Sequence, residues 1–561
     1  MSTRRFSPGL WILSTGLWAY LAAFLVYPLG CVALGAFRGP GGLSLRLIAR
    51  VLADPRQWEI LMNSVNLALG VTLAATALAL PAAVAMRAVE LPGRSLLRGL
   101  LLAPLVLPPF VGAVGLRRLC ARFGTVNLLL MDTGITDRPL DLLGNGWLGL
   151  VLMEALHLYP ILYLQLSASL SKVGADLEEA ARAAGAGPFA VWRRVLMPLA
   201  APGYFAGASL VFIGSLTDLG TPLIFDRRDL LPVQVFAMLN DVHENPAGYV
   251  LVLLMILAAL AFFAFARWME SGVAADEGVR GAQASVRARR ARPALAAALW
   301  MIAASPALLA ILPLLAVALT AFADRWVLAA LPQTITTRHL LEVFSHPLTV
   351  SSLRNSLLLA CASTTLDLGA GLGVAYIATR TRLPGRHALE VLALLPLAVP
   401  GVLVAFGYLV GFSGTFLDAR LHPFPLLVLA YGTRRLPILS RVAAAGLSRS
   451  GGELEQAARS AGAGPARAFL RVSLPLLLPH LLAGAILCFS LSVLEVSDSL
   501  MLAQEEPSYP IAKALYALLA RPDGTAAACA LALLATLLVA AGLLAALKIA
   551  GRSASGLFRA S

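Results

Sequence analysis

Charged residues are scarce in this sequence of 561 residues. Asp, Glu, Lys and Arg together make up 13% of the chain, while 59% of its residues are hydrophobic. A soluble domain has about 25% charged residues, which help to cover its surface. The composition therefore excludes a soluble globular chain and indicates a polytopic membrane protein.

Lysine is especially rare, and this limits the chemistry. The chain has three lysines, Lys172, Lys513 and Lys548, and none of them follows a glycine. A phosphate-cradling loop, GxxxxGK followed by Ser or Thr, is therefore absent, so we expect no ATP hydrolysis on this chain. The sequence also lacks HExxH, GxSxG and any Cys/His spacing typical of a metal site. We expect no enzyme active site, no bound metal and no cofactor.

The few cysteines show no paired spacing. Four of the five lie in apolar stretches, which favours small buried hydrophobic side chains over disulfides or metal ligands. The five are Cys31, Cys120, Cys361, Cys488 and Cys529.

Long apolar stretches are abundant, and twelve of them approach the roughly 20 residues that a bilayer-spanning helix needs. They lie near 10–37, 60–86, 98–116, 146–168, 200–225, 248–267, 295–322, 354–378, 389–411, 424–442, 478–502 and 525–548. The first is too long for the apolar part of a signal peptide and lacks a small-residue cleavage site, so we expect it to be retained. The predicted fold is all-α, with about 12 transmembrane helices.

The distribution of basic residues predicts the orientation. The net charge of +14 would suggest a nucleic-acid partner for a soluble protein, but in a membrane protein basic residues favour the cytoplasmic side. With the N-terminus inside, 28 Lys and Arg lie on the cytoplasmic side and 16 on the other. We therefore expect both termini in the cytoplasm and no nucleic-acid partner.

One stretch occurs twice, as Asp176 to Pro198 and, 277 residues later, as Glu453 to Pro475. In the first copy we expect a helix of about two turns, capped by Asp176 in a capping box with Glu179 and ended by Gly185. Its apolar face is mostly alanine. The four residues of that face are Leu177, Ala180, Ala181 and Ala184 in the first copy, and Leu454, Ala457, Ala458 and Ala461 in the second. A helix this short is marginal alone, and its small side chains suit the groove of another protein.

The duplication extends beyond these two loops. Asn63-Ser64 matches Asn355-Ser356, and Pro104 and Pro108 match Pro396 and Pro400, all 292 residues apart. The change of offset to 277 places 15 extra residues in the first half, and we expect them in the outer loop 118–144. The predicted domains are a first half, 1–270, a cytoplasmic linker, 271–294, and a second half, 295–561. Two such halves in the same orientation predict a path between them.

The two loops resemble the EAA loop of ATP-binding-cassette importer permeases. The pattern runs Glu-Ala-Ala, three residues, Gly, nine residues, an aliphatic residue, a spacer, an apolar residue and Pro. The matching residues are Glu179, Ala180, Ala181, Gly185, Val195, Met197 and Pro198 in the first copy, and Gln456, Ala457, Ala458, Gly462, Val472, Leu474 and Pro475 in the second. Met197 and Gln456 depart from the usual Leu and Glu.

The resemblance implies a function and partners. In this family each half presents a coupling helix to one of two separate cytoplasmic ATPase subunits, and a solute-binding protein delivers the solute outside. It also implies a multi-pass protein of the bacterial inner membrane, in contact with membrane lipid. An ion-coupled secondary carrier is the alternative class, because twelve spans in two parallel halves also describe that group.

Ionisable residues inside apolar spans are the candidates for the translocation path. Asp218 and Glu495 occupy equivalent positions, and Asp498 lies three residues further on. We expect the first two to face each other near the outer mouth, where they would suit a cationic substrate. Alternatively, they lie at the water interface or cap helix ends. Glu154, His157 and Asp367 are further candidates, and for His157 a hydrogen-bonded packing role is favoured.

The stretch TDLGTPLIF, residues 217–225, and the fused layout are similar to permeases of the ferric-iron importer group. That group also includes thiamine and phosphonate or polyamine relatives. Ferric iron is the expected substrate, and thiamine, phosphonate and polyamine stay open as alternatives.

Overall fold

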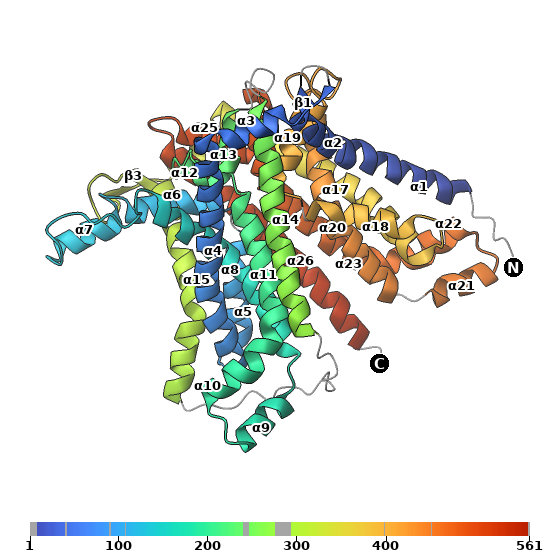
Figure 1. Cartoon of the computed structure of the whole chain (residues 1–561), viewed down its shortest axis with the longest axis horizontal. Coiled ribbons are helices and arrows are strands. Elements are labelled where there is room, and N and C mark those ends of the chain that lie inside the picture. The colour runs from blue at the N-terminus through green and yellow to red at the C-terminus, as the bar shows by residue number, and fades with distance from the viewer. Residues whose placement is uncertain are drawn as a thin grey trace. The chain divides into compact units, whose positions relative to one another are not determined.

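The computed structural model describes residues 8–39, 42–88, 91–106, 108–238, 246–274, 293–397, 399–449 and 452–558. Within these ranges the regular secondary structure is almost entirely helical (Figure 1). Two small antiparallel pairs are the exceptions in the described part: β1 (Arg38–Gly39) with β2 (Gly42–Leu43), and β3 (Ala323–Arg325) with β4 (Thr334–Ile335). The predicted all-α class is confirmed.

Nine helical segments in the described residues are long and apolar enough to cross a membrane, or up to eleven if each of two bent pairs counts as one span. The nine are Pro8–Ala36, Pro55–Ala88, Trp147–Ser171, Pro188–Leu216, Ala247–Met269, Pro293–Phe322, Pro347–Arg380, Pro465–Val493 and Thr525–Ala546. The remaining predicted span, 424–442, lies in α20 (Pro423–Arg449), which carries four arginines.

The predicted third span of each half is not a straight helix. In the first half α5 (Arg94–Leu102) and the helical segment that begins at Pro109 meet at 95°, and in the second half the corresponding pair meets at 106°. The second pair is α18 (Arg386–Leu394) and α19 (Gly401–Gly411). Prolines lie at each bend, three in the first half and two in the second, where they remove backbone donors and disfavour helix in the residues before them. The stretches predicted as spans at 98–116 and 389–411 are therefore each broken into two helices.

The chain forms two compact units that do not coincide with the two sequence halves. Unit 1 contains Met1–Arg46, Leu239–Tyr249 and Thr337–Ser561, and unit 2 contains Leu47–Met238 and Val250–Thr336. The first membrane helix of each half thus packs with the remaining helices of the other half. The repeat boundaries remain a prediction, and most of the predicted linker, 275–292, lies outside the described residues.

Unit 1 is built on α17 (Pro347–Arg380) and α20. Of the N-terminal helices, α1 (Pro8–Leu21) packs against α17 and α2 (Tyr27–Ala36) packs against α19. Leu17 and Leu21 lie in one core cluster with Val374 and Leu436. The Tyr408 hydroxyl donates a hydrogen bond of 2.7 Å to the backbone oxygen of Phe24. The remaining elements of unit 1 are α16 (Arg338–Glu342), α21 (Glu453–Ser460), α22 (Pro465–Ala468), α23 (Leu474–Val493), α24 (Ser497–Leu502), α25 (Ile511–Leu519) and α26 (Thr525–Phe558).

Unit 2 is built on α4 (Pro55–Ala88), α8 (Trp147–Ser171) and α11 (Met197–Leu216), with α15 (Pro293–Phe322) against α4 and α6 (Pro109–Cys120). The contact between α6 and α15 is very close, since a Cβ at Gly115 would lie 1.8 Å from the backbone oxygen of Pro313. The other elements are α3 (Arg46–Ala53), α7 (Thr125–Asp132), α9 (Ala175–Ala183), α10 (Pro188–Val191), α12 (Gly220–Ile224), α13 (Leu231–Ala237) and α14 (Ala247–Ala274); α3 and α14 each begin within unit 1.

The serines of the repeated Asn-Ser pairs accept corresponding hydrogen bonds in the two units. Ser64 accepts a hydrogen bond of 2.8 Å from the backbone nitrogen of Leu231, at the start of α13. Ser356 accepts one of 2.8 Å from that of Ile511, at the start of α25. The duplication seen in the sequence therefore extends to tertiary contacts.

Candidate functional site

The two repeated loops have the same succession of elements. α9 is followed by α10, a π-helical turn (Trp192–Leu196) and α11, and α21 is followed by α22, a π-helical turn (Phe469–Ser473) and α23. In unit 2, α9 and α10 lie at the opposite end from α7 and β3 (Figure 1). Each loop is thus a short helix set off from the long helices by a tight turn.

Gly185 and Gly462 end the short helices as predicted. Their φ angles are +85° and +90°, in the left-handed region that favours glycine. The nitrogen of the following residue, Ala186 or Ala463, donates back to the oxygen of Ala181 or Ala458, at 3.0 Å in each loop. This is the Schellman arrangement, which satisfies the last carbonyls of a helix.

The predicted capping box is wrong. α9 begins at Ala175 after Gly174, whose backbone is extended, and no side chain caps it. Asp176 lies inside the first turn, where its charge still favours the positive end of the helix. α21 likewise has a glycine, Gly452, at its cap position.

The alanine faces of both short helices are open within the described chain. Ala180, Ala184 and Ala457 are exposed, while Ala181 and Ala458 are half-buried. Leu454 is 54% exposed. Glu179 and Gln456, which occupy the Glu position of the loop pattern, are exposed too. Pro198 and Pro475, near the starts of α11 and α23, are also exposed. Apolar side chains left uncovered in this way form a surface suited to a partner.

The acidic residue held by the fold is Glu178, which sequence reasoning passed over. Its carboxylate forms an ion pair with Arg87, at the end of α4, and a second one of 3.3 Å with Arg182. Arg87 also donates to the backbone oxygens of Leu170 and Val173, at the end of α8. One guanidinium therefore joins α4, α8 and α9, with both members of the pair largely buried.

Glu455 occupies the matching position in the second loop. It is 7% exposed and accepts a hydrogen bond of 2.9 Å from Ser473, in the π-helical turn before α23. A signal for this role was present in the sequence. An acid stands at 178 and at 455, whereas the neighbouring Glu179 is replaced by Gln456.

Asp218 caps a short helix in unit 2. Its two carboxylate oxygens accept hydrogen bonds of 3.2 Å from the backbone nitrogens of Gly220 and Thr221, at the start of α12. This geometry matches the alternative weighed for it in the sequence. Asp218 thus has a structural role as a helix cap.

Glu495 and Asp498 lie in a buried network of charges in unit 1. Arg434 contacts both acids, at 3.2 Å from Asp498, and Arg435 contacts Glu495. Arg435 also donates to the backbone oxygen of Leu491 at 2.9 Å. Two arginines and two carboxylates thus neutralise one another. Charges out of water need such pairing.

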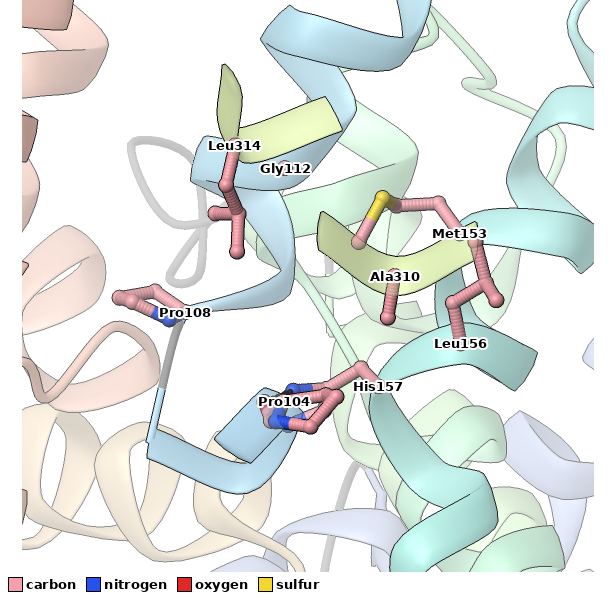
Figure 2. A pocket seen from close by; sticks show the side chains of 8 residues that line it. All are labelled: Pro104, Pro108, Gly112, Met153, Leu156, His157, Ala310 and Leu314. Carbon is pink, nitrogen blue, oxygen red and sulfur yellow. Dashed lines mark hydrogen bonds between the residues drawn. The ribbon is translucent and has the colours of Figure 1, made fainter. Parts of the chain in front are cut away.

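Of the remaining candidates, Glu154 and His157 have hydrogen-bond partners within unit 2. Ser215 donates to the Glu154 carboxylate. The Nδ1 atom of His157 lies 2.9 Å from the backbone oxygen of Pro104. Figure 2 shows His157 beside Pro104 in a small, mostly apolar pocket at the bend between α5 and α6. Among the described residues, no hydrogen-bond partner lies near either carboxylate oxygen of Asp367. The same part of the chain holds no group of three or more His, Cys, Asp and Glu able to bind a metal.

Comparison with known proteins assigns a family to both halves. A family model described as "Binding-protein-dependent transport system inner membrane component" matches residues 75–275 and again residues 368–548. The chain is 23% identical over 492 residues to the ferric transport system permease protein FbpB of Actinobacillus pleuropneumoniae, covering 84% of this chain and 69% of the relative. A putative ferric transport permease, FbpB 1, of Haemophilus influenzae is 24% identical over 85% and 76%. The molybdenum transport permease ModB of Mycobacterium tuberculosis is 30% identical, over 43% of this chain and 90% of the relative.

Proposed function

Because this chain belongs to the family of binding-protein-dependent transport system inner membrane components, we propose that it is the membrane-spanning permease subunit of an ATP-driven importer. It would form the path for a solute that an extracytoplasmic binding protein delivers. The observation that carries this proposal is the pair of short helices, α9 and α21, whose alanine faces are exposed. The family match to both halves also favours this class over an ion-coupled carrier.

Each short helix would receive one ATPase subunit, because the chain has no phosphate-binding loop of its own. A close approach to a partner's groove requires small side chains, and the exposed alanines supply them. In this proposal both loops face the cytoplasm, both termini are cytoplasmic, and the protein lies in a bacterial inner membrane. The excess of Lys and Arg near the loops supports that orientation.

The pair Arg87–Glu178 supplies a route from the loop to the membrane helices. Movement of α9 pulls on Glu178, and Arg87 passes the displacement to the ends of α4 and α8. In the second loop Glu455 and Ser473 join α21 to the π-helical turn before α23. ATP-driven motion would reach the path through these contacts.

Ferric iron is the proposed substrate. Two of the relatives that align over more than four-fifths of the chain are named as ferric transport permeases. Thiamine, phosphonate and polyamine remain the alternatives, with molybdate added by the shorter match to ModB. Asp218, Glu495 and Asp498 are proposed to border the path, with their present contacts fixing the short helices α12 and α24.

Uptake in whole cells tests the proposal. We expect accumulation of radioactive ferric iron to stop when cellular ATP is depleted, and to persist when an uncoupler collapses the proton gradient while ATP is maintained. The tagged chain should co-purify with an ATP-binding-cassette ATPase from mild detergent. Uptake that follows the proton gradient and ignores ATP would establish the ion-coupled alternative instead.

A further inference from the structure

The first half has an extension that the second half lacks. The segment between α6 and α8, residues 121–146, is 15 residues longer than the segment between α19 and α20, residues 412–422. This confirms the predicted position of the extra residues. They fold into α7 and the chain that returns from it, and we call residues 121–140 together with the loop 326–335 the lateral arm.

The two parts of the lateral arm are joined at their base. The Arg118 guanidinium stacks over the Trp326 ring, 4.2 Å from its centroid, and donates to the Trp326 backbone oxygen. Trp326 directly follows β3, which itself follows α15. In Figure 1, α7 and β3 lie side by side and extend sideways from the end of α15 within unit 2.

In α7 of the arm the buried residue is polar, whereas leucines are exposed or half-buried. Asn127 is the only buried residue of α7. Its side chain donates to the backbone oxygens of Ala121 and Leu140 and accepts from the Leu140 nitrogen, at 2.8 to 3.1 Å. The amide thus closes the loop by satisfying backbone groups. A helix packed against protein and facing water would bury its leucines instead.

The outward side chains are large and apolar in both parts of the arm. In the first part they are Phe123, Leu129, Ile135 and Leu140, and in the second Val327, Leu328, Leu331 and Ile335, with exposed fractions from 44% to 76%. Leu328 also has a positive φ of 47°, which is uncommon for a residue with a Cβ atom.

The surface of α15 continues into this arm. Leu308, Leu312, Leu315 and Leu319 recur every three or four residues along the helix and are all exposed, so they form one stripe. A stripe of this kind on a membrane-spanning helix faces lipid tails. It ends close to Phe322, where β3 begins, so the arm starts at the boundary between the tails and the headgroups.

We propose that the lateral arm is an interfacial anchor, lying in the membrane plane with its apolar side chains at the boundary between lipid headgroups and acyl chains. The 95° bend at Pro104 and Pro108 directs α6 and α7 along the membrane instead of across it. The charged residues of the arm, Arg122, Asp132, Asp137 and Arg138, are exposed and do not form a basic cluster. The anchor therefore selects the apolar boundary itself and not an anionic headgroup.

Spin labels on the full chain in nanodiscs of phosphatidylcholine test the proposal. The five cysteines are replaced by alanine, and a nitroxide is attached to a single new cysteine in L129C or L328C. L312C serves as the control deep in lipid and D137C as the control in water. Collisions with oxygen and with a water-soluble nickel chelate give the depth of each label.

We expect the ratio of oxygen to nickel collisions at 129 and 328 to exceed that at 137 and to fall below that at 312. Should L328C fail to fold, F123C gives the same reading, because Phe123 is 57% exposed in the same arm. Free access of the nickel chelate to both labels would overturn the proposal, because it would show that the arm lies in water, where a soluble protein could bind it. So would a depth equal to that of residue 312.

Discussion

Arg434 forms a buried ion pair with Glu495, and the position that corresponds to Arg434 in the first half carries His157. Glu495 and its counterpart Asp218 are both acids, but Asp218 binds backbone nitrogens of α12. The two halves thus share their backbone plan and differ in how they satisfy the same buried acid.

Loss of charge at these two acids should have different effects on stability. Glu495→Gln leaves Arg435 without a carboxylate partner in the described network and Arg434 with Asp498 alone. Breaking a buried pair costs about 3 to 5 kcal/mol. Asp218→Asn weakens two hydrogen bonds at a cost of about 1 to 3 kcal/mol. Thermal unfolding in detergent should therefore show a larger fall in Tm for Glu495→Gln.

The same two variants address the translocation path. If the acids border the path, a variant that folds correctly should show a raised KM for uptake. This change is distinct from any fall in total uptake caused by a smaller amount of folded protein. Normal KM in correctly folded Asp218→Asn and Glu495→Gln would remove these residues from the path.

Glu178 and Glu179 form a matched pair for testing coupling. Glu178→Gln removes the ion pair with Arg87 and should lower uptake strongly, because α9 is no longer tied to α4 and α8. The lost charge-assisted hydrogen bonds correspond to about 1.5 to 3 kcal/mol. Glu179→Gln replaces an exposed carboxylate by glutamine, which the second loop already has at the equivalent position, Gln456. This change should leave protein stability unchanged.

The readout that separates coupling from folding is ATPase activity of the assembled complex in proteoliposomes. Glu178→Gln should hydrolyse ATP with little uptake, and the exchange R87E with E178R should restore part of the uptake. Equal uptake per ATP in wild type and Glu178→Gln would contradict the proposed route.

Two glycines of each loop respond differently to valine. Gly185 and Gly462 have positive φ, so a β-branched residue there strains the turn by about 1 to 2 kcal/mol or more and misplaces the short helix. Gly187 and Gly464 have φ near −65° with extended ψ, and no atom lies within 4 Å of an added Cβ. Uptake and ATPase co-purification should be lost in G185V with G462V, and retained in G187V with G464V. Full activity in the first double variant would refute a docking role for the loops.

The close contact of α6 with α15 gives a further test in unit 2. Gly115→Ala places a methyl group 1.8 Å from the Pro313 oxygen, so the two helices must separate. Overpacking of this kind costs about 1 to 3 kcal/mol or more. At Gly112→Ala the nearest atom is the terminal methyl of Met153, at 2.4 Å, which a flexible side chain can move aside. The melting temperature should fall for Gly115→Ala and stay near wild type for Gly112→Ala.

Several features of the fold followed from short stretches of sequence. Gly185 ended its helix as expected, because its position after Ala184 asks for a left-handed residue. The apolar stretches marked the long helices, because bilayer thickness and helix rise set their length. The repeat at Asn63-Ser64 and Asn355-Ser356 indicated two related halves, and the corresponding contacts agree.

Other features were beyond such local reasoning. Asp176 fitted a capping box, but the backbone entered α9 one residue before it, so its side chain had no cap to form. The prolines at 104, 108, 396 and 400 mark the repeat in the sequence, but the bends at these positions appear only in the structure. Leu129 and its neighbours lie in a stretch that the sequence predicts as an outer loop. The exposure of Leu129 and the burial of Asn127 show that the apolar side chains face outwards.

The sequence by itself determined the membrane class, the duplication and the two loops, since composition, helix length and turn chemistry depend on residues close together in the chain. The tertiary structure decided which acid of each loop is held, how the buried charges pair, and which unit receives each first helix. Those outcomes depend on residues such as Arg87 and Glu178, 91 positions apart, whose contact exists only once the helices have packed. Desolvation then determines which charges pair, because a charge removed from water needs a partner among the residues that the fold brings close.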